Sequence, residues 1–154
     1  RNPHSIRQAD TYDEDIHGQH ARTLYPVLLS KLAHIPFQRA LDLGCGTGEM
    51  MKMLLQSDDQ RELYGIDLSE KMLSVAEGKL SSKVQLVLGD SEHLPFADNF
   101  FDVVYCNDSF HHYPAPENVI REVQRVLKPG GTFLIGDCWQ PLVGRAIMNF
   151  LYAP

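Results

Sequence analysis

The stretch Leu41-Asp42-Leu43-Gly44-Cys45-Gly46-Thr47-Gly48 decides the fold of this chain. It continues a short apolar run, Ala40–Leu43, and leads into Met50, Met53 and Leu54, which have the spacing of one helix face. Glycines between a strand and a helix allow a sharp bend and let a ligand approach main-chain atoms without an intervening Cβ. Three alternating glycines would only weaken a purely structural turn, so we predict that this turn binds a ligand.

The same alternation of apolar runs and helical stripes continues along the chain. Five runs predict strands: Ala40–Leu43, Leu63–Ile66, Val84–Leu88, Phe101–Cys106 and Thr132–Ile135. A second helix is predicted after Ser69, its N-cap, with apolar residues at Met72, Leu73, Ala76 and Leu80. A third begins at Pro116 and ends before Pro129-Gly130-Gly131. Its apolar residues are Val119, Ile120, Val123, Val126 and Leu127. Apolar strands that alternate with helices are typical of a parallel sheet covered on both faces. The predicted fold class is therefore α/β, a doubly wound sheet.

Helical spacing also flanks this core. A stripe from Ile16 to Leu32 predicts an N-terminal helix that ends near Ile35-Pro36, and another helix begins at Leu142. No repeat, low-complexity tract or linker interrupts the chain. We predict two regions: residues 1–38, an N-terminal helical extension, and residues 39–154, the α/β core.

Composition narrows the function. The chain has 154 residues, 44% of them hydrophobic, with 20 acidic and 14 basic side chains and a net charge of −6. This length is typical of one domain, and the lack of a basic run disfavours a nucleic-acid groove. No stretch approaches the ~18 consecutive apolar residues of a membrane span. The three cysteines share no C-x-x-C spacing, which argues against a disulfide framework or a zinc site and is typical of a reducing cytoplasm.

The glycine turn departs from the dinucleotide fingerprint G-x-G-x-x-G. Its third glycine would fall at position 49, but that position holds Glu49 and the third glycine is Gly48. A carboxylate at a helix N-terminus would repel a pyrophosphate where the helix dipole should attract it. A phosphate-free ligand with an ammonium or sulfonium group suits Asp42 and Glu49 better.

A second carboxylate follows the next predicted strand. Asp67 lies 23 residues after Gly44, at the position from which an acidic side chain can accept hydrogen bonds from both ribose hydroxyls. The alternative is that Asp67 only caps the following helix, although Ser69 is better placed for that role. We predict the ribose contact.

Five motifs in this order resemble class I S-adenosylmethionine-dependent methyltransferases, most closely the type-11 domain group, which includes enzymes similar to the quinone-biosynthesis methyltransferases. The resemblance covers about Tyr12 to Gly136. The motifs are Asp42–Gly48, Gly65–Leu73, Gly89–Phe96, Phe100–Val104 and Leu127–Gly131.

The resemblance implies a role for each matching residue. The methionine end of S-adenosylmethionine would be held by Asp42, Gly44, Cys45, Gly46, Thr47 and Gly48. Asp67 would bind the ribose, Leu68 and Met72 would sandwich the adenine, Asp90 would accept its amino group, and the Ser91 backbone would lie near the ring. Asn107 would face the methionine end and the substrate, and Tyr12, in the extension that covers the site, would close over the cofactor. Met72 fits a plain core position equally well.

His111 and His112 follow the fourth predicted strand, where this family recognises its substrate. A histidine, with an ordinary pKa of about 6.5, can deprotonate a hydroxyl or an acidic carbon during methyl transfer; alignment alone is enough for acceptors that ionise readily. We predict both as catalytic candidates, with a packed pair that shapes the pocket as the alternative. His17 and His20 have ligand-like spacing, but nothing completes a set, so no metal site is predicted.

The family sheet has seven strands, whereas only five can be counted here. The resemblance therefore implies a Rossmann-like sheet of five parallel strands in the order 3-2-1-4-5, with the family's sixth and seventh strands absent. The fifth strand would be an exposed edge, which favours its coverage by a second copy of the chain or by a further segment.

Together these features predict a cytoplasmic S-adenosylmethionine-dependent methyltransferase that acts on a small molecule. Three alternatives remain: a non-catalytic S-adenosylmethionine-binding module or fragment, an RNA or protein methyltransferase, and a dinucleotide-dependent oxidoreductase. Net charge disfavours the second and Glu49 the third. The acceptor, its reacting atom and the oligomeric state are left open.

Overall fold

A five-stranded parallel sheet organises the computed structural model, which describes residues 19–58 and 60–137. Its strands lie in the order β3-β2-β1-β4-β5, as predicted. The elements in chain order are α2 (Gln19–Leu32), β1 (Arg39–Leu43), α3 (Glu49–Ser57), β2 (Glu62–Asp67), α4 (Glu70–Lys79), β3 (Val84–Leu88), β4 (Phe101–Asn107), the 3₁₀ turn η1 (Phe110–His112), α5 (Pro116–Val126) and β5 (Leu127–Gly136).

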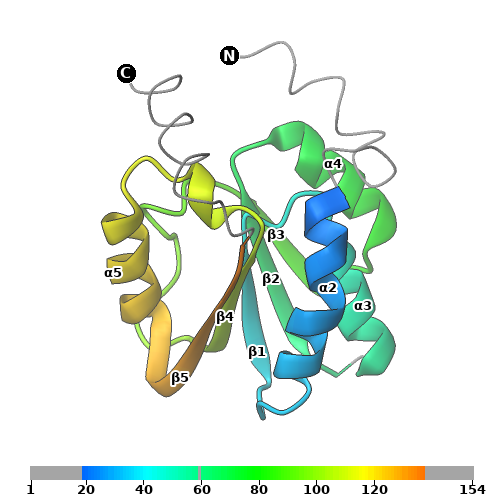
Figure 1. The fold of residues 1–154 in the computed structure, drawn as a ribbon, viewed down its shortest axis with the longest axis horizontal. Coiled ribbons are helices and arrows are strands. Elements are labelled where there is room, and N and C mark those ends of the chain that lie inside the picture. The colour runs from blue at the N-terminus through cyan, green and yellow to red at the C-terminus, as the bar shows by residue number, and fades with distance from the viewer. Residues whose placement is uncertain (1–18, 59, 138–154) are drawn as a thin grey trace.

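Helices cover both faces of the sheet (Figure 1). Helices α2, α3 and α4 lie on one side and α5 on the other. Successive strand residues point to opposite faces, so Val103 and Tyr105 of β4 pack beneath α2 and α3, whereas Val104 and Cys106 pack beneath α5. All four side chains are fully buried, so residues 103–106 are buried on both faces of the sheet rather than on alternate residues only.

The start of α4 confirms the predicted cap. The Ser69 hydroxyl oxygen accepts a hydrogen bond from the Met72 main-chain N–H at 3.3 Å. This bond satisfies one of the N–H groups that the first turn of a helix leaves without a partner. Leu73 and Ala76 then point into the core, as their spacing predicts.

Helix α5 ends earlier, and β5 begins earlier, than the sequence predicts. The helix stops at Val126, and Leu127, which the stripe assigned to the helix, begins β5 opposite Phe101. The Phe100 main-chain N–H donates to the Val126 carbonyl at 2.7 Å, so the last turn of the helix is tied to the start of β4 and the chain continues as a strand. Gly130, with φ +78°, lies in the resulting bulge rather than before the strand.

Among the described residues, β5 pairs only with β4. Several expectations lie outside those residues: the absence of a sixth and seventh strand, the final helix from Leu142, the start of the first helix at Ile16, and the positions of Tyr12 and His17. No helix in the described ranges is long and apolar enough to cross a membrane.

Candidate functional site

The glycine turn after β1 folds back onto the end of β2. The main-chain N–H groups of Gly44 and Cys45 both donate to the Ile66 carbonyl, at 2.9 and 3.0 Å. Gly44 and Gly46 have φ values of +73° and +52°, in the left-handed region that favours glycine. A Cβ on Gly44 would lie 2.5 Å from the Ser109 hydroxyl, whereas one on Gly46 would meet nothing within 4 Å. Gly44 therefore permits close packing, and Gly46 leaves the main chain open to a ligand.

A cavity of about 40 Å³ lies beside this turn. Six of the residues predicted to bind the cofactor line it, together with three others; the full lining is Ala21, Tyr25, Asp42, Gly44, Cys45, Gly46, Thr47, Met50 and Asn107. Gly48 does not line it: this glycine is the N-cap of α3, and a Cβ there would lie 2.7 Å from Leu80. Since one water needs about 10–15 Å³, the cavity suits a small polar group rather than a nucleoside.

Helix α2 closes one side of this cavity through Ala21 and Tyr25. The Asn107 side-chain amide donates to the Ala21 carbonyl at 3.3 Å, which joins the helix to the end of β4. A second cavity, of about 340 Å³, lies between α2 and α3 and shares Tyr25 with the first. None of the residues predicted to bind the cofactor lines this larger cavity, so the candidate site is the smaller one.

Acceptor groups dominate the small cavity. The Asp42 carboxyl is almost fully buried, and burial raises its pKa to about 8; the nearby Tyr105 hydroxyl lowers that pKa and the charge of Asp67 raises it. The Asn107 Oδ1 atom is buried without a hydrogen-bond partner. A buried acceptor without a donor is costly, so Asn107 Oδ1 is suited to receive an ammonium group, and such a cation would favour the ionised form of Asp42 beside it.

Asp67 joins two turns through its carboxylate. Its Oδ2 accepts the Gly46 main-chain N–H and its Oδ1 accepts the Ser69 main-chain N–H, each at 2.8 Å. Burial raises the pKa of Asp67, and these main-chain donors lower it. The helix cap itself is Ser69, so Asp67 is not merely the cap. Each carboxylate oxygen keeps a further lone pair with which it can accept a hydroxyl.

The residues predicted to surround the adenine lie at the C-terminal ends of β2 and β3. Leu68 is 70% exposed, an unusual position for an apolar side chain that suits contact with a ring, and Met72 is half-buried. Asp90 accepts the Glu92 main-chain N–H at 2.9 Å, and the buried Ser91 donates its hydroxyl to that of Tyr113 at 3.3 Å. These bonds fix the turn after β3, while the contact with adenine stays a prediction.

The structure changes the interpretation of Glu49. The Lys79 ammonium group of α4 lies 2.9 Å from the Glu49 carboxylate, and the pair is largely shielded from solvent. An opposite charge at this distance offsets the repulsion that the sequence analysis attributed to Glu49. The preference for a cationic ligand therefore depends on Asp42 and Asn107.

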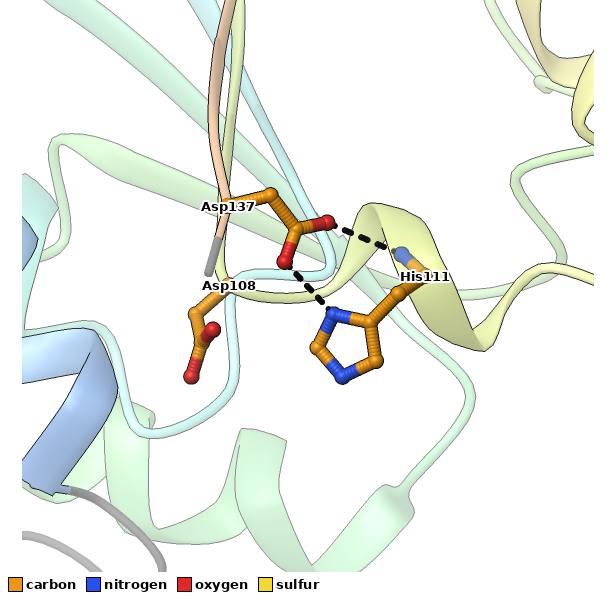
Figure 2. Close-up of side chains that lie close together, drawn as sticks. All are labelled: Asp108, His111 and Asp137. Atoms are coloured by element: carbon orange, nitrogen blue, oxygen red, sulfur yellow. Dashed lines mark hydrogen bonds and ion pairs between the residues drawn. The ribbon is translucent and has the colours of Figure 1, made fainter. Parts of the chain in front are cut away.

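The two predicted histidines have different surroundings. The two oxygens of Asp137 accept the His111 main-chain N–H at 3.0 Å and face its Nδ1 at 2.6 Å (Figure 2). The ring of His112 lies against that of His111, with centroids 3.9 Å apart; burial and the charge of His111 lower the pKa of His112. Among the described residues no carboxylate makes a hydrogen bond or ion pair with His112, although the charges of Asp108 and Asp137 act to raise its pKa.

The sequence patterns did not single out Asp137 and Asp108, which the structure places beside His111. Asp137 directly follows β5 and Asp108 directly follows β4, and polar atoms of these two residues and His111 all lie within 4.8 Å of one another. One signal was available: the carboxyl ends of neighbouring parallel strands meet at the same edge of a sheet. A polar residue directly after each strand could therefore have been added to the candidates.

Comparisons with known proteins agree with this geometry. Residues 41–135 match the family model described as a methyltransferase domain. The demethylmenaquinone methyltransferase of Bacillus licheniformis is 38% identical over 117 residues, which are 73% of this chain and 50% of that protein. The 27-O-demethylrifamycin SV methyltransferase of Amycolatopsis mediterranei is 38% identical over 64% of this chain and 38% of its own length.

Solved structures show the same fold. YcgJ of Bacillus subtilis has a TM-score of 0.70 at 29% identity, covering 84% of this chain and 57% of that one. A putative methyltransferase from Bacillus halodurans has a TM-score of 0.69 at 30% identity, covering 81% and 56%.

The matches identify the family of this chain and show how much of each relative's length the chain covers. The chain spans about half the length of the curated relatives that it matches. The motifs from Asp42 to Gly131 all fall within the matched range, which confirms the resemblance found in the sequence. Because the family model covers more than half of the chain, this protein belongs to the methyltransferase domain family.

Proposed function

We propose that this chain binds S-adenosylmethionine and transfers its methyl group to a small molecule. The observation that carries the proposal is the cavity beside the glycine turn, where the Asp42 carboxyl and the unpartnered Asn107 Oδ1 converge. The relatives support a small acceptor, because their names refer to demethylmenaquinone and to a demethylrifamycin. When bound, S-adenosylmethionine supplies a methyl group made electrophilic by a sulfonium.

The chain's own residues fit the parts of this ligand. Asp42 and Asn107 Oδ1 would receive the ammonium group, with the open main chain at Gly46 beside it. Asp67 would accept the ribose hydroxyls with its remaining lone pairs. Leu68 and Met72, with Asp90 and Ser91 across the edge of the sheet, would contact the adenine. Cys45 and Thr47 line the cavity, and Gly48 sets the start of α3.

Helix α2 would exclude water from the methionine end, since Ala21 and Tyr25 line the cavity. In this proposal the chain consists of a helical extension, residues 1–38, and a core, residues 39–154. We also propose a cytoplasmic location, in keeping with the two buried cysteines, Cys45 and Cys106, which are free. A second copy of the chain, or a further segment, would pair with the edge of β5.

A second candidate is a module that binds the cofactor without turning it over. The observation that favours it is the lining of the small cavity, which includes six residues predicted to bind the cofactor but neither His111 nor His112. Turnover separates the two: both bind S-adenosylhomocysteine, but only an enzyme releases it from S-adenosylmethionine in the presence of an acceptor.

Titration calorimetry with S-adenosylhomocysteine tests the proposal. We expect saturable binding at one site, and no heat from NADH at the same concentration. Binding should weaken strongly in Asn107→Leu, which removes the unpartnered acceptor while keeping the side-chain size. The control is Glu77→Ala, an exposed position on α4 away from the cavity. Binding of NADH in place of S-adenosylhomocysteine would refute the proposal.

A further inference from the structure

Hydrogen bonds join the loop after β4 to the residues at the end of β5. The Asp108 main-chain N–H donates to the Gly136 carbonyl at 2.6 Å, which fixes the two strand ends to each other. His111 lies in the 3₁₀ turn that follows Asp108, and Asp137 follows Gly136 directly. The His111–Asp137 contact therefore joins two neighbouring strands rather than two flexible loops.

The contact orients His111 in two ways. One oxygen of Asp137 holds the main-chain N–H of His111 and the other faces the ring nitrogen Nδ1, so both the turn and the ring are fixed. A carboxylate can only accept hydrogen bonds, and at 2.6 Å the proton therefore lies on Nδ1. In a neutral imidazole the other nitrogen, Nε2, then keeps a lone pair that can accept a proton.

The nitrogen Nε2 is available for that role. Figure 2 shows it on the edge of the ring turned away from Asp137, without a dashed line. It has no hydrogen bond to any described residue, and the His111 side chain is 36% exposed. The loop that carries His111 directly follows Asn107, the last residue of β4, which lines the candidate cofactor cavity. The free nitrogen therefore belongs to the loop that borders the site of methyl transfer.

Two carboxylates lie beside the ring of His111. Asp137 and Asp108 are the carboxylates that face the ring, and Asp108 Oδ1 is buried without a partner. The neighbouring His112 adds no repulsion while it is neutral, which is the form that its burial favours. The same carboxylate–imidazole arrangement stabilises an imidazolium in other enzymes.

We propose that Asp137 is a positioning residue that holds His111 as a general base, so that the acceptor is one that must lose a proton, either a hydroxyl or an acidic carbon. The inference rests on the methyl transfer proposed above. The acceptor's O–H or C–H bond breaks and its proton passes to Nε2 of His111. Its electron pair forms the bond to the methyl carbon, and the pair of the methyl–sulfur bond returns to sulfur, which leaves a neutral thioether.

The tautomer of His111 can be measured without an acceptor or a cofactor. In ¹⁵N-labelled protein above pH 7.5, we expect the His111 signals of a ring protonated on Nδ1. The variant Asp137→Ala should shift them toward the Nε2-protonated form that free histidine prefers, whereas Glu77→Ala should leave them unchanged. An Nε2-protonated ring in the unmodified chain would overturn the inference. So would a displacement of these signals by millimolar Mg²⁺, because the three side chains would then form a cation site.

Turnover supplies the second test, with a short-chain demethylmenaquinone, chemically reduced so that its ring is electron-rich, as the probe acceptor. General bases contribute roughly 10²–10⁴-fold, so His111→Gln should lower kcat by about 100-fold or more. Asp137→Asn should lower kcat by about 10-fold or more, because an amide cannot accept both N–H groups. The KM of the acceptor and the affinity for S-adenosylhomocysteine should stay nearly constant in both variants.

Different experimental results would refute the proposed function and the inference about Asp137. If the unmodified chain does not bind S-adenosylhomocysteine, the proposed function is wrong, whatever the His111 tautomer. If it binds the ligand and transfers methyl groups, but His111→Gln keeps its kcat or loses cofactor affinity in parallel, then His111 only shapes the pocket. In that case the inference about Asp137 is wrong and the proposed function stands.

Discussion

The two halves of the candidate site are built in different ways. The proposed cofactor half consists of Asp42 and the glycine turn, which adjoin in the sequence and lie where β1 and β2 end, with Asp42, Cys45 and Thr47 buried. The acceptor half consists of His111 and Asp137, which are 26 residues apart and meet only because β4 and β5 are neighbours. The first half is part of the packing of the protein, whereas the second lies at its exposed edge. Substitutions in the first should therefore affect folding and binding, and those in the second only turnover.

The largest expected effect concerns the packing of the glycine turn. Gly44→Ala should lower the free energy of unfolding by about 2–5 kcal/mol, because a left-handed φ costs an alanine ~1–2 kcal/mol and overpacking costs ~1–3 more. The new Cβ would lie 2.5 Å from the Ser109 hydroxyl, which donates to the Leu43 carbonyl. Urea denaturation measures the change.

The matched control for Gly44→Ala is Gly78→Ala. Gly78 lies in helix α4 with nothing within 4 Å of a new Cβ, so this variant should gain roughly 0.5–1 kcal/mol in the free energy of unfolding. Equal effects at the two positions would mean that the turn is not under steric constraint.

The next effect tests the carboxylate between the two turns. Asp67→Ala should weaken S-adenosylhomocysteine binding by about 2–4 kcal/mol, or roughly 30- to 1,000-fold, because two charge-assisted hydrogen bonds to the ribose are lost. Asp67→Asn should fall between the parent chain and Asp67→Ala. Calorimetry on the three proteins measures the affinity.

Asp67→Ala should also reduce the free energy of unfolding, by about 1–3 kcal/mol, since Gly46 and Ser69 lose their acceptor. The sequence alone, with Asp67 at the tip of a strand, would predict almost no such change. An unchanged affinity in Asp67→Ala would show that this carboxylate serves the turns alone.

A smaller effect is expected in the pH dependence of stability. The pKa of Asp42 is about 8 in the folded protein and near 4 when unfolded, so the folded state binds more protons between these values. The contribution of this carboxyl to stability is complete below pH ~4 and decreases as the pH rises to about 8. The slope is at most about 1.4 kcal/mol per pH unit.

The variant Asp42→Asn isolates that slope, because its side chain has a similar shape and does not titrate. The stability of Asp42→Asn relative to the parent chain should rise between pH 5 and pH 8, as measured by urea denaturation at each pH. A constant difference would mean that Asp42 is ionised throughout this range.

The smallest effect lies outside the cavity. Ser69→Ala should lower the free energy of unfolding by about 1 kcal/mol, the usual value of an N-cap, through loss of the bond to the Met72 main-chain N–H. Affinity for S-adenosylhomocysteine should be nearly unchanged, because the Ser69 side chain faces the helix. A large loss of affinity would extend the cofactor half of the site to this hydroxyl.

The sequence predicts what depends on local pattern. The five strands, the Ser69 cap and the residues of the glycine turn follow from apolar runs, capping preference and glycine spacing, each within a few neighbouring residues. The strand order came from the family resemblance, and the structure and the family match confirm it.

What the sequence does not predict depends on contacts between distant segments. The pairing of Glu49 with Lys79 joins α3 to α4, and the end of α5 at Val126 depends on its bond to Phe100 at the start of β4. The contact of Asp137 with His111 likewise requires the topology of the sheet. The positions of Asp137 and Asp108 directly after strands could have made them candidates, but their closeness to His111 depends on how the turn after β4 folds.

The bond between Asp67 and the Gly46 main chain joins the two ends of the proposed cofactor site, so we expect ligand binding at one end to depend on the other. A ligand fragment that fixes the Asp67 carboxylate also fixes the turn that would hold the other fragment. Each fragment would thus lower the ordering cost of its neighbour, and such coupling is reciprocal. Adenosine and methionine, added as separate molecules, should each bind more tightly in the presence of the other, and Asp67→Ala should abolish this cooperativity.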